Sequence, residues 1–182
     1  GLQIEAVAAT PFLWMAHSGA ASIEYSHEIL TFQIAAPGVD IVSAILTPLM
    51  ALLVLGLVML GGVKAMRGAA FPRLLPPLAL ALVAALIVSN KVGSPQFQTW
   101  LIAPVILWIV FDRIRSGTPA AIALVLCALT FIVYPLVYTD LLRAELLPVL
   151  VITARNVLLV VLLLVSVRAL VRVPVSSVRP RH

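Results

Sequence analysis

Charged residues are scarce in this sequence. Lys, Arg, Asp and Glu make up only 10% of its 182 residues, whereas a typical globular chain carries about a quarter. The hydrophobic fraction is 63% and the mean hydropathy is +1.17. So few charges cannot cover the surface of a soluble particle of this size. We therefore expect the chain to lie in a lipid bilayer.

Cysteine is nearly absent as well, because Cys127 is the only one and lies inside an apolar run. An internal disulfide and a thiolate metal cluster are thereby excluded. His17, His27 and Glu28 invite a metal interpretation, but they lack the HExxH or any other ligand spacing, so we expect no metal site and no cofactor. The pI is about 10.2, yet the basic residues form no single patch, and we expect no nucleic-acid partner.

No positive charge precedes Lys64, so we expect no cleavable signal peptide with a basic start in this sequence. The first residue is Gly1 rather than a methionine. We interpret the sequence as the carboxy-terminal part of a longer membrane protein.

Five apolar stretches are candidates to cross the membrane, since a spanning helix needs about 20 mostly apolar residues. The second and third are short, and Pro135 is expected to kink the fourth. The five stretches are residues 41–63, 74–88, 95–111, 119–138 and 148–170. The sequence thus predicts an all-α integral membrane bundle of about five helices over residues 41–170, with an extracytoplasmic segment 1–40 before it and a cytoplasmic basic tail 171–182 after it.

Positive charge sets the predicted orientation, because cytoplasmic loops hold an excess of Lys and Arg. With five crossings, nine loop cations fall on one side and two, Lys91 and Arg143, on the other. The nine are Lys64, Arg67, Arg73, Arg113, Arg115, Arg168, Arg172, Arg179 and Arg181. Six of the seven acidic residues lie on the side of Lys91. Residues 1–40 and the loop around Lys91 are therefore expected outside, and the carboxy terminus in the cytoplasm.

The outer segment divides into two parts. "GLQIEAVAATPFLWMA" has small and apolar residues at helical spacing, interrupted by Pro11, which suits a short helix at the membrane interface. "ASIEYSHEILTFQIAAPG" has β-branched and aromatic residues in partial alternation, which favours a short hairpin or extended ribbon.

The stretch "SNKVGSPQFQTW" (89–100) is polar between two apolar runs. Ser94 followed by Pro95 predicts a helix start in which the serine oxygen caps an amide. Gly93 allows a sharp turn and close approach of a ligand, and Lys91 adds a charge beside the free amides. A helix amino end with a lysine suits an anion, above all a phosphate.

The side chains that follow are open to two interpretations. Gln96 and Gln98 can hydrogen-bond hydroxyls, while Phe97 and Trp100 offer faces for a sugar ring. Alternatively, Lys91 snorkels to the interface and Trp100 belongs to the aromatic belt.

Arg155 is the one charge deep inside an apolar run, about 10 Å along a helix that starts near Pro148. A charge there is a functional candidate by default. It could pair with a donor phosphate, with Asn156 beside it, or it could snorkel or form a structural ion pair with Glu145 or Asp140.

Two motifs carry a resemblance to a known family. "NKVGSPQFQTWLIAP" resembles the K-x-x-S-P-Q-[YF] stretch of glycosyltransferase family 87, in the GT-C superfamily, and "GLQIEAVAATP" is similar to that group's R-G-L-Q-I-E-S signature, with Ala6 in place of the serine. Their order and spacing agree, as does "PGV" (37–39) before an apolar run. The resemblance implies a membrane enzyme that moves a sugar, usually mannose, from a polyprenyl-phosphate donor to an outer glycan or glycolipid.

The same resemblance, with the local chemistry above, suggests roles for individual residues. Glu5 could orient an acceptor hydroxyl or act as a base. The superfamily's catalytic acid in an early outer loop is expected upstream of Gly1, so we expect this chain alone to be inactive. The expected donor-phosphate ligands are Lys91, Ser94, Gln96 and Arg155, and the expected sugar or lipid contacts are Gln3, Phe97 and Trp100.

Two other functions compete with this hypothesis. A transporter or flippase subunit could use Arg155 and Lys91 to mark a path for an anionic lipid, although no internal repeat of the kind common in transporters is present. A purely structural scaffold would leave the cluster from Lys91 to Gln96 unexplained. In the leading hypothesis the protein is a multi-pass protein of a bacterial-type plasma membrane.

Overall fold

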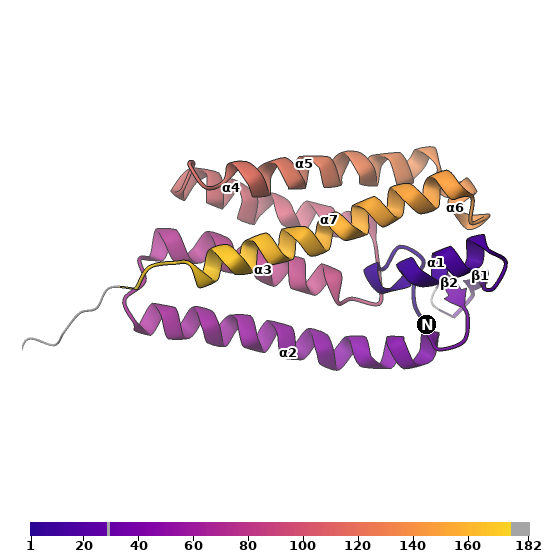
Figure 1. Ribbon diagram of the computed structural model, residues 1–182, viewed down its shortest axis with the longest axis horizontal. Helices are drawn as coiled ribbons and strands as arrows, with labels where there is room; N and C mark the ends of the chain where they lie inside the picture. Colours follow the sequence, from indigo (N-terminus) through magenta and orange to yellow (C-terminus); the bar gives the residue numbers. More distant parts are fainter. Residues whose placement is uncertain (29, 176–182) are drawn as a thin grey trace, which may run out of the picture.

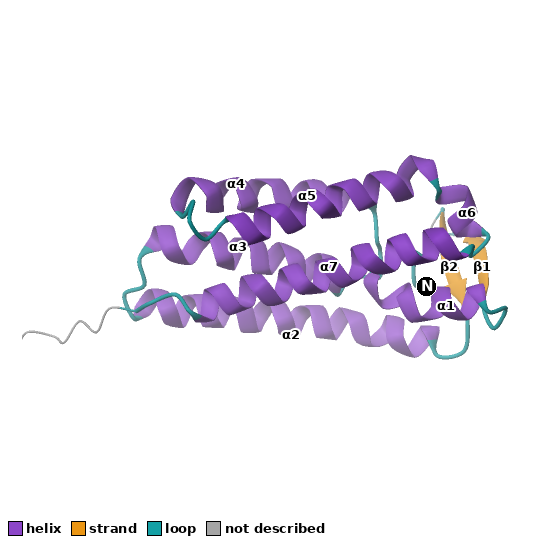
Figure 2. Ribbon diagram, turned by 45° about the horizontal axis from the view of Figure 1, so that its top comes forward, coloured by secondary structure: helices purple, strands orange, loops and turns teal. Residues whose placement is uncertain are grey.

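Long helices run side by side along most of the length of the molecule (Figures 1 and 2). The computed structural model describes residues 1–28 and 30–175. The bundle consists of α2 (Val39–Met66), α3 (Phe71–Val88), η2 (Pro95–Leu101), α4 (Ile102–Phe111), α5 (Gly117–Phe131), η3 (Ile132–Leu136) and α7 (Leu146–Val171). The predicted all-α membrane bundle is confirmed.

Four helical stretches are long and apolar enough to cross a membrane among the described residues: Val39–Met66, Phe71–Val88, Gly117–Leu136 and Leu146–Val171. Pro95–Phe111, expected as another crossing, is apolar but shorter. Large apolar side chains of α2 point outward, with Ile41 and Leu52 each 67% exposed. Such a continuous apolar surface is unsuited to water, so the chain is a multi-pass membrane protein.

Helix α7 is the centre of the bundle and packs against both α3 and α5, while α3 also packs against α2 and α4. The approach of α2 to α3 depends on Gly61, where an added Cβ would lie 2.6 Å from a methyl carbon of Leu78. Small residues let membrane helices approach closely in this way.

The amino-terminal segment covers one end of the bundle (Figure 1). It contains η1 (Val7–Ala9), α1 (Thr10–His17), and an antiparallel hairpin of β1 (Ser22–Ser26) and β2 (Thr31–Ala35) with Glu24 opposite Gln33. The predicted hairpin is therefore confirmed. Pro11 lies in the first turn of α1 and does not interrupt it, since proline needs no amide partner there.

Helix α1 lies against α7, and the short helix α6 (Tyr138–Leu142) lies at the same end. The Nδ1 atom of His17 is 2.9 Å from the carbonyl oxygen of Ala144. This histidine therefore ties α1 to the turn between α6 and α7.

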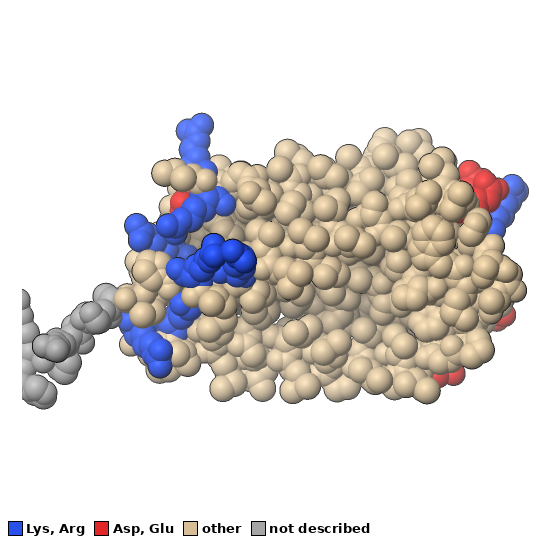
Figure 3. Space-filling view, viewed as in Figure 1, with Lys and Arg blue, Asp and Glu red and all other residues tan. Residues whose placement is uncertain are grey.

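Lys and Arg side chains gather at the opposite end of the bundle (Figure 3). This end contains the α2–α3 and α4–α5 connections and the end of α7. The Nζ of Lys64 donates to the carbonyl oxygen of Val173 at 2.7 Å, which fixes the segment after α7. Arg179 and Arg181 of the predicted tail lie outside the described residues. The predicted separation of charge between the two ends is thus present in the fold.

Candidate functional site

The two motifs, about 90 residues apart in the sequence, lie in direct contact. The backbone N–H of Gln3 donates to the carbonyl oxygen of Lys91 at 3.0 Å. The N–H of Gly93 donates to Oε1 of Gln3 at 2.8 Å, and Nε2 of Gln3 donates to Oγ1 of Thr31 at 2.5 Å. Gln3, expected to contact sugar or lipid, instead uses both ends of its amide to join the Lys91 loop to the hairpin.

Gly93 is required at this contact because another backbone passes over it. A Cβ at this position would lie 2.1 Å from the carbonyl carbon of Glu5 and 2.4 Å from the backbone nitrogen of Ala6. The sequence suggested that Gly93 admits a ligand. In the structure, the backbone of the amino-terminal motif at Glu5 and Ala6 occupies that space.

Arg155 of α7 connects both motifs from within the bundle, where only 3% of it is exposed. Its Nη1 donates to the carbonyl oxygen of Glu5 at 2.9 Å and to Oδ1 of Asn156 at 3.0 Å, and its Nη2 donates to the carbonyl oxygen of Gly93 at 3.3 Å. A charged donor forms stronger bonds than a neutral one, so this guanidinium is well suited to hold the two segments together.

The neighbouring Asn156 continues the same connection. Its Nδ2 donates to Oγ1 of Thr10 at 2.9 Å and lies 3.4 Å from the carbonyl oxygen of Ala6. Among the described residues no ion pair joins Arg155 to Glu145 or Asp140, the partners that the structural alternative proposed. The Nε of Arg155 is buried and has no hydrogen-bond partner in the described structure.

Glu5 is buried, with 2% of its surface exposed, and faces two tyrosines. The hydroxyl of Tyr138 donates to its Oε1 at 2.7 Å, and the hydroxyl of Tyr134 donates to the same oxygen. The two rings are stacked, with centroids 4.4 Å apart. Burial, and then the negative charge of Glu5, raises the pKa of Tyr138 well above its usual range, so this phenol remains a donor.

The chain places the tyrosines through a break in the fourth apolar stretch. Tyr134 leaves helical geometry, with φ −121° and ψ 116°, immediately before Pro135. The predicted kink at Pro135 is thus present, and α6 follows in a new direction. Sequence reasoning missed both tyrosines, and their spacing of four residues around a proline was the only available signal.

The second oxygen of Glu5, Oε2, is buried without a hydrogen-bond partner in the described structure. The carboxylate is closed off from solvent, and the hydroxyls that it binds belong to the protein. The geometry therefore gives Glu5 a positioning role between the first motif and the tyrosines. Acting as a base on an acceptor would require this pocket to open.

The start of the third apolar helix is where the sequence placed it, but its capping differs. Pro95 begins η2, and Ser94 is the N-cap residue without a side-chain hydrogen bond. Instead its backbone carbonyl accepts the N–H of Phe97 at 3.1 Å. This bond of the 3₁₀ turn pairs backbone groups that a helix end otherwise leaves without a hydrogen bond. The prediction that the side-chain oxygen of Ser94 caps the helix is therefore wrong.

The other residues of this loop that were predicted to contact the donor differ in their exposure to solvent. Lys91 is partly buried and Gln96 is exposed. Phe97 is buried in a core cluster, while the ring of Trp100, which is 47% exposed, lies tilted against it with the ring centroids 4.5 Å apart. Of the two predicted ring contacts, Trp100 is therefore accessible at the surface and Phe97 is not.

An apolar groove begins beside this loop, between α4 and α5, with a volume of about 210 Å³. Its walls include Leu101, Ile106 and Ile109 on one side and Leu124 on the other. Gln98 lies at one end of it, and its amide is buried without a hydrogen-bond partner in the described structure.

Metal ligands do not gather in the described part of the chain, where no group of three or more His, Cys, Asp or Glu side chains could hold an ion. Comparisons with protein-family models, with curated proteins and with solved structures found no match. The functional interpretation therefore depends on the geometry of the site and on the motifs.

Proposed function

We propose that this chain is the carboxy-terminal part of a membrane glycosyltransferase that transfers a sugar from a polyprenyl-phosphate donor to an extracytoplasmic glycan or glycolipid. The resemblance of the two motifs makes mannose the expected sugar. One observation carries the proposal: the loop with Lys91 leads directly into the continuous helix η2–α4, whose residues form one wall of the apolar α4–α5 groove.

A polyprenyl-phosphate sugar has a charged headgroup attached directly to a long apolar chain. A cation beside a helix start suits the phosphate, and a groove between membrane helices suits the chain. In the transfer reaction the lipid phosphate is the leaving group. Lys91 would stabilise the negative charge that develops on it as the sugar departs.

The contacts between the two motifs hold the proposed phosphate-binding site rigidly. Gln3 and Arg155 both bond to Gly93, two residues from Lys91. Arg155 is thereby a positioning residue in the proposal, and not the direct phosphate ligand that the sequence suggested. Preorganised positive groups stabilise charge without rearranging at the moment of reaction.

The distribution of charge supports the proposed orientation. Loop cations at the α2–α3 and α4–α5 connections mark that end as cytoplasmic by the positive-inside rule. The motif end would then face outward across a bacterial-type plasma membrane, with the carboxy terminus in the cytoplasm.

The test is sugar transfer from a polyprenyl-phosphate sugar by the full-length protein in membranes. Lys91→Gln should lower the rate by about 10²-fold, since removing one preorganised donor costs about this much in other enzymes. Arg143→Gln is the matched control, because it removes an exposed cation from the α6–α7 turn at the same end. An unchanged rate of transfer in Lys91→Gln would refute the assignment of Lys91 to a phosphate-binding site.

The competing function is distinguished in the same membranes. A flippase subunit would move a labelled anionic lipid between leaflets without transferring its sugar. Movement of intact donor that depends on Lys91, with no transfer to any acceptor, would favour the transporter.

A further inference from the structure

A second hollow lies at the basic end of the bundle, opposite the end that holds the first motif and the Lys91 loop. It is formed by the α4–α5 turn and the last turns of α7, and its volume is about 430 Å³. Three arginines line it, Arg115, Arg168 and Arg172. We call it the arginine pocket. No role proposed above uses this hollow.

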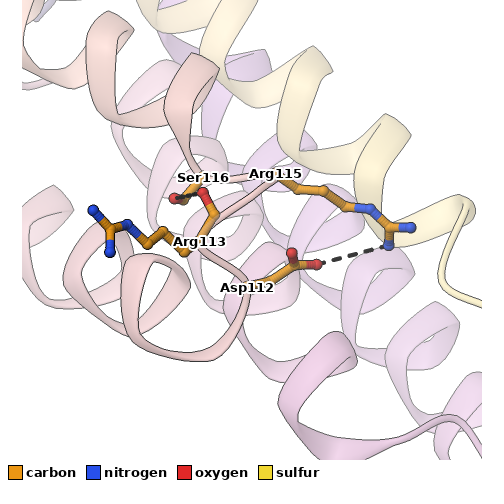
Figure 4. A network of polar contacts seen from close by, with 4 residues as sticks. All are labelled: Asp112, Arg113, Arg115 and Ser116. Atoms are coloured by element: carbon orange, nitrogen blue, oxygen red, sulfur yellow. Dashed lines mark hydrogen bonds and ion pairs between the residues drawn. The ribbon is translucent and has the colours of Figure 1, made fainter.

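The arginines converge from two separate elements. Arg168 and Arg172 are four residues apart on α7 and its end, so they share one face of the helix. Arg115 comes from the α4–α5 turn, and its side chain reaches toward α7 (Figure 4). Arg113, in the same turn, points in the opposite direction (Figure 4).

Negative side chains balance these three arginines only weakly. Arg115 pairs with Asp112 at 3.7 Å, and its side chain is 62% exposed. Exposed pairs at this distance contribute little. No other ion pair is found among the described residues. The arginine pocket therefore holds three guanidinium groups against one carboxylate.

The remaining walls are suited to a lipid. Thr118 lies in the first turn of α5, where free amides favour an anion. Trp108, Val165 and Ala169 give the pocket an apolar side, and Trp108 is almost fully buried. A site with cations on one side and an apolar wall on the other suits a headgroup that is attached to a chain.

We propose that the arginine pocket binds the phosphate of an anionic glycerophospholipid from the leaflet at the basic end of the bundle. Guanidinium groups bind phosphate oxygens through paired hydrogen bonds. Basic pockets between membrane helices at such a surface are suited to anionic headgroups. The lipid links the α4–α5 turn to α7.

The test measures binding of short-chain phosphatidylglycerol to the full chain purified in a neutral detergent. The expected result is saturable binding that is at least about 10-fold tighter than binding of phosphatidylcholine with the same chains. Arg168→Gln and Arg172→Gln should each weaken it by about 5-fold, the effect of one surface cation on an anionic lipid. Arg113→Gln is the matched control and should change the affinity by less than about 2-fold.

Asp112→Asn should increase the affinity for phosphatidylglycerol, an effect that misfolding cannot produce. It removes the carboxylate that competes for Arg115, so phosphatidylglycerol should bind more tightly. Equal weakening by Arg113→Gln and Arg168→Gln would overturn the proposal, because it would indicate a general charge effect. Phosphatidylcholine binding of equal strength, or inorganic phosphate that competes as well as the lipid, would also overturn it.

Discussion

Replacing Gly93 with alanine tests the contact between the two motifs most directly. The added Cβ would lie 2.1 Å from the carbonyl carbon of Glu5, where ordinary contact begins at 3.4 Å. The two backbones must therefore separate by about 1.3 Å, the difference between these distances. The clashing atom belongs to the backbone of Glu5 and not to a flexible side chain, so a change of rotamer cannot relieve the clash.

This separation has an energetic cost that the structure allows us to work out. Overpacking costs about 1–3 kcal/mol. The bonds from Gly93 to Gln3 and from Gln3 to Lys91 are lost, at about 1 kcal/mol each. We expect Gly93→Ala to lower the free energy of unfolding by about 3–5 kcal/mol and, by displacing the Lys91 loop, to lower sugar transfer as well.

The measurement is reversible unfolding in mixed micelles, monitored by a spectroscopic signal of the folded bundle. Gly62→Ala is the matched control, because nothing lies within 4 Å of the Cβ it adds in α2. It should be neutral or stabilise by up to about 1 kcal/mol, since alanine favours a helix over glycine. A Gly93→Ala protein that unfolds like the control would refute the close approach of the motifs.

Three further substitutions test the packing around the site and along the bundle. Tyr138→Phe removes a donor to the buried carboxylate of Glu5, so unfolding in the same assay should become easier by about 1.5–3 kcal/mol. Lys64→Met removes the bond that holds the segment after α7, so amide exchange there should rise, whereas Arg67→Met should leave it unchanged. Gly61→Leu should force α2 away from α3 at a cost of about 1–3 kcal/mol, and a wild-type unfolding curve would contradict the tight contact.

The membrane helices could be predicted well because hydropathy alone determines them. The expected stretches 74–88 and 148–170 lie inside Phe71–Val88 and Leu146–Val171. The fourth stretch was expected to continue to residue 138 but leaves helical geometry at Tyr134. A proline predicts such a break, yet it does not specify the direction of the chain after it.

The site was predictable only in part. The motifs and their shared location follow from order and charge, but contacts across 90 residues are not encoded in spacing. The sequence could not show that the amide of Gln3 bonds to Gly93, or that Tyr134 and Tyr138 meet Glu5. Such pairs form because the folded bundle brings the amino-terminal segment, the α3–η2 loop and the η3–α6 region to one end, where most buried polar groups find a partner within the protein.

Charge balance links these contacts to the proposed substrate. Arg155 bonds to neutral carbonyl oxygens, so its charge is not cancelled by a direct ion pair. The carboxylate of Glu5 opposes it at longer range, and Lys91 adds a second cation, so these three residues together carry one positive charge in excess. A sugar joined to a polyprenol through a phosphodiester carries one negative charge. Since complementary charge favours the matching partner, the proposed site favours such a donor over a neutral lipid.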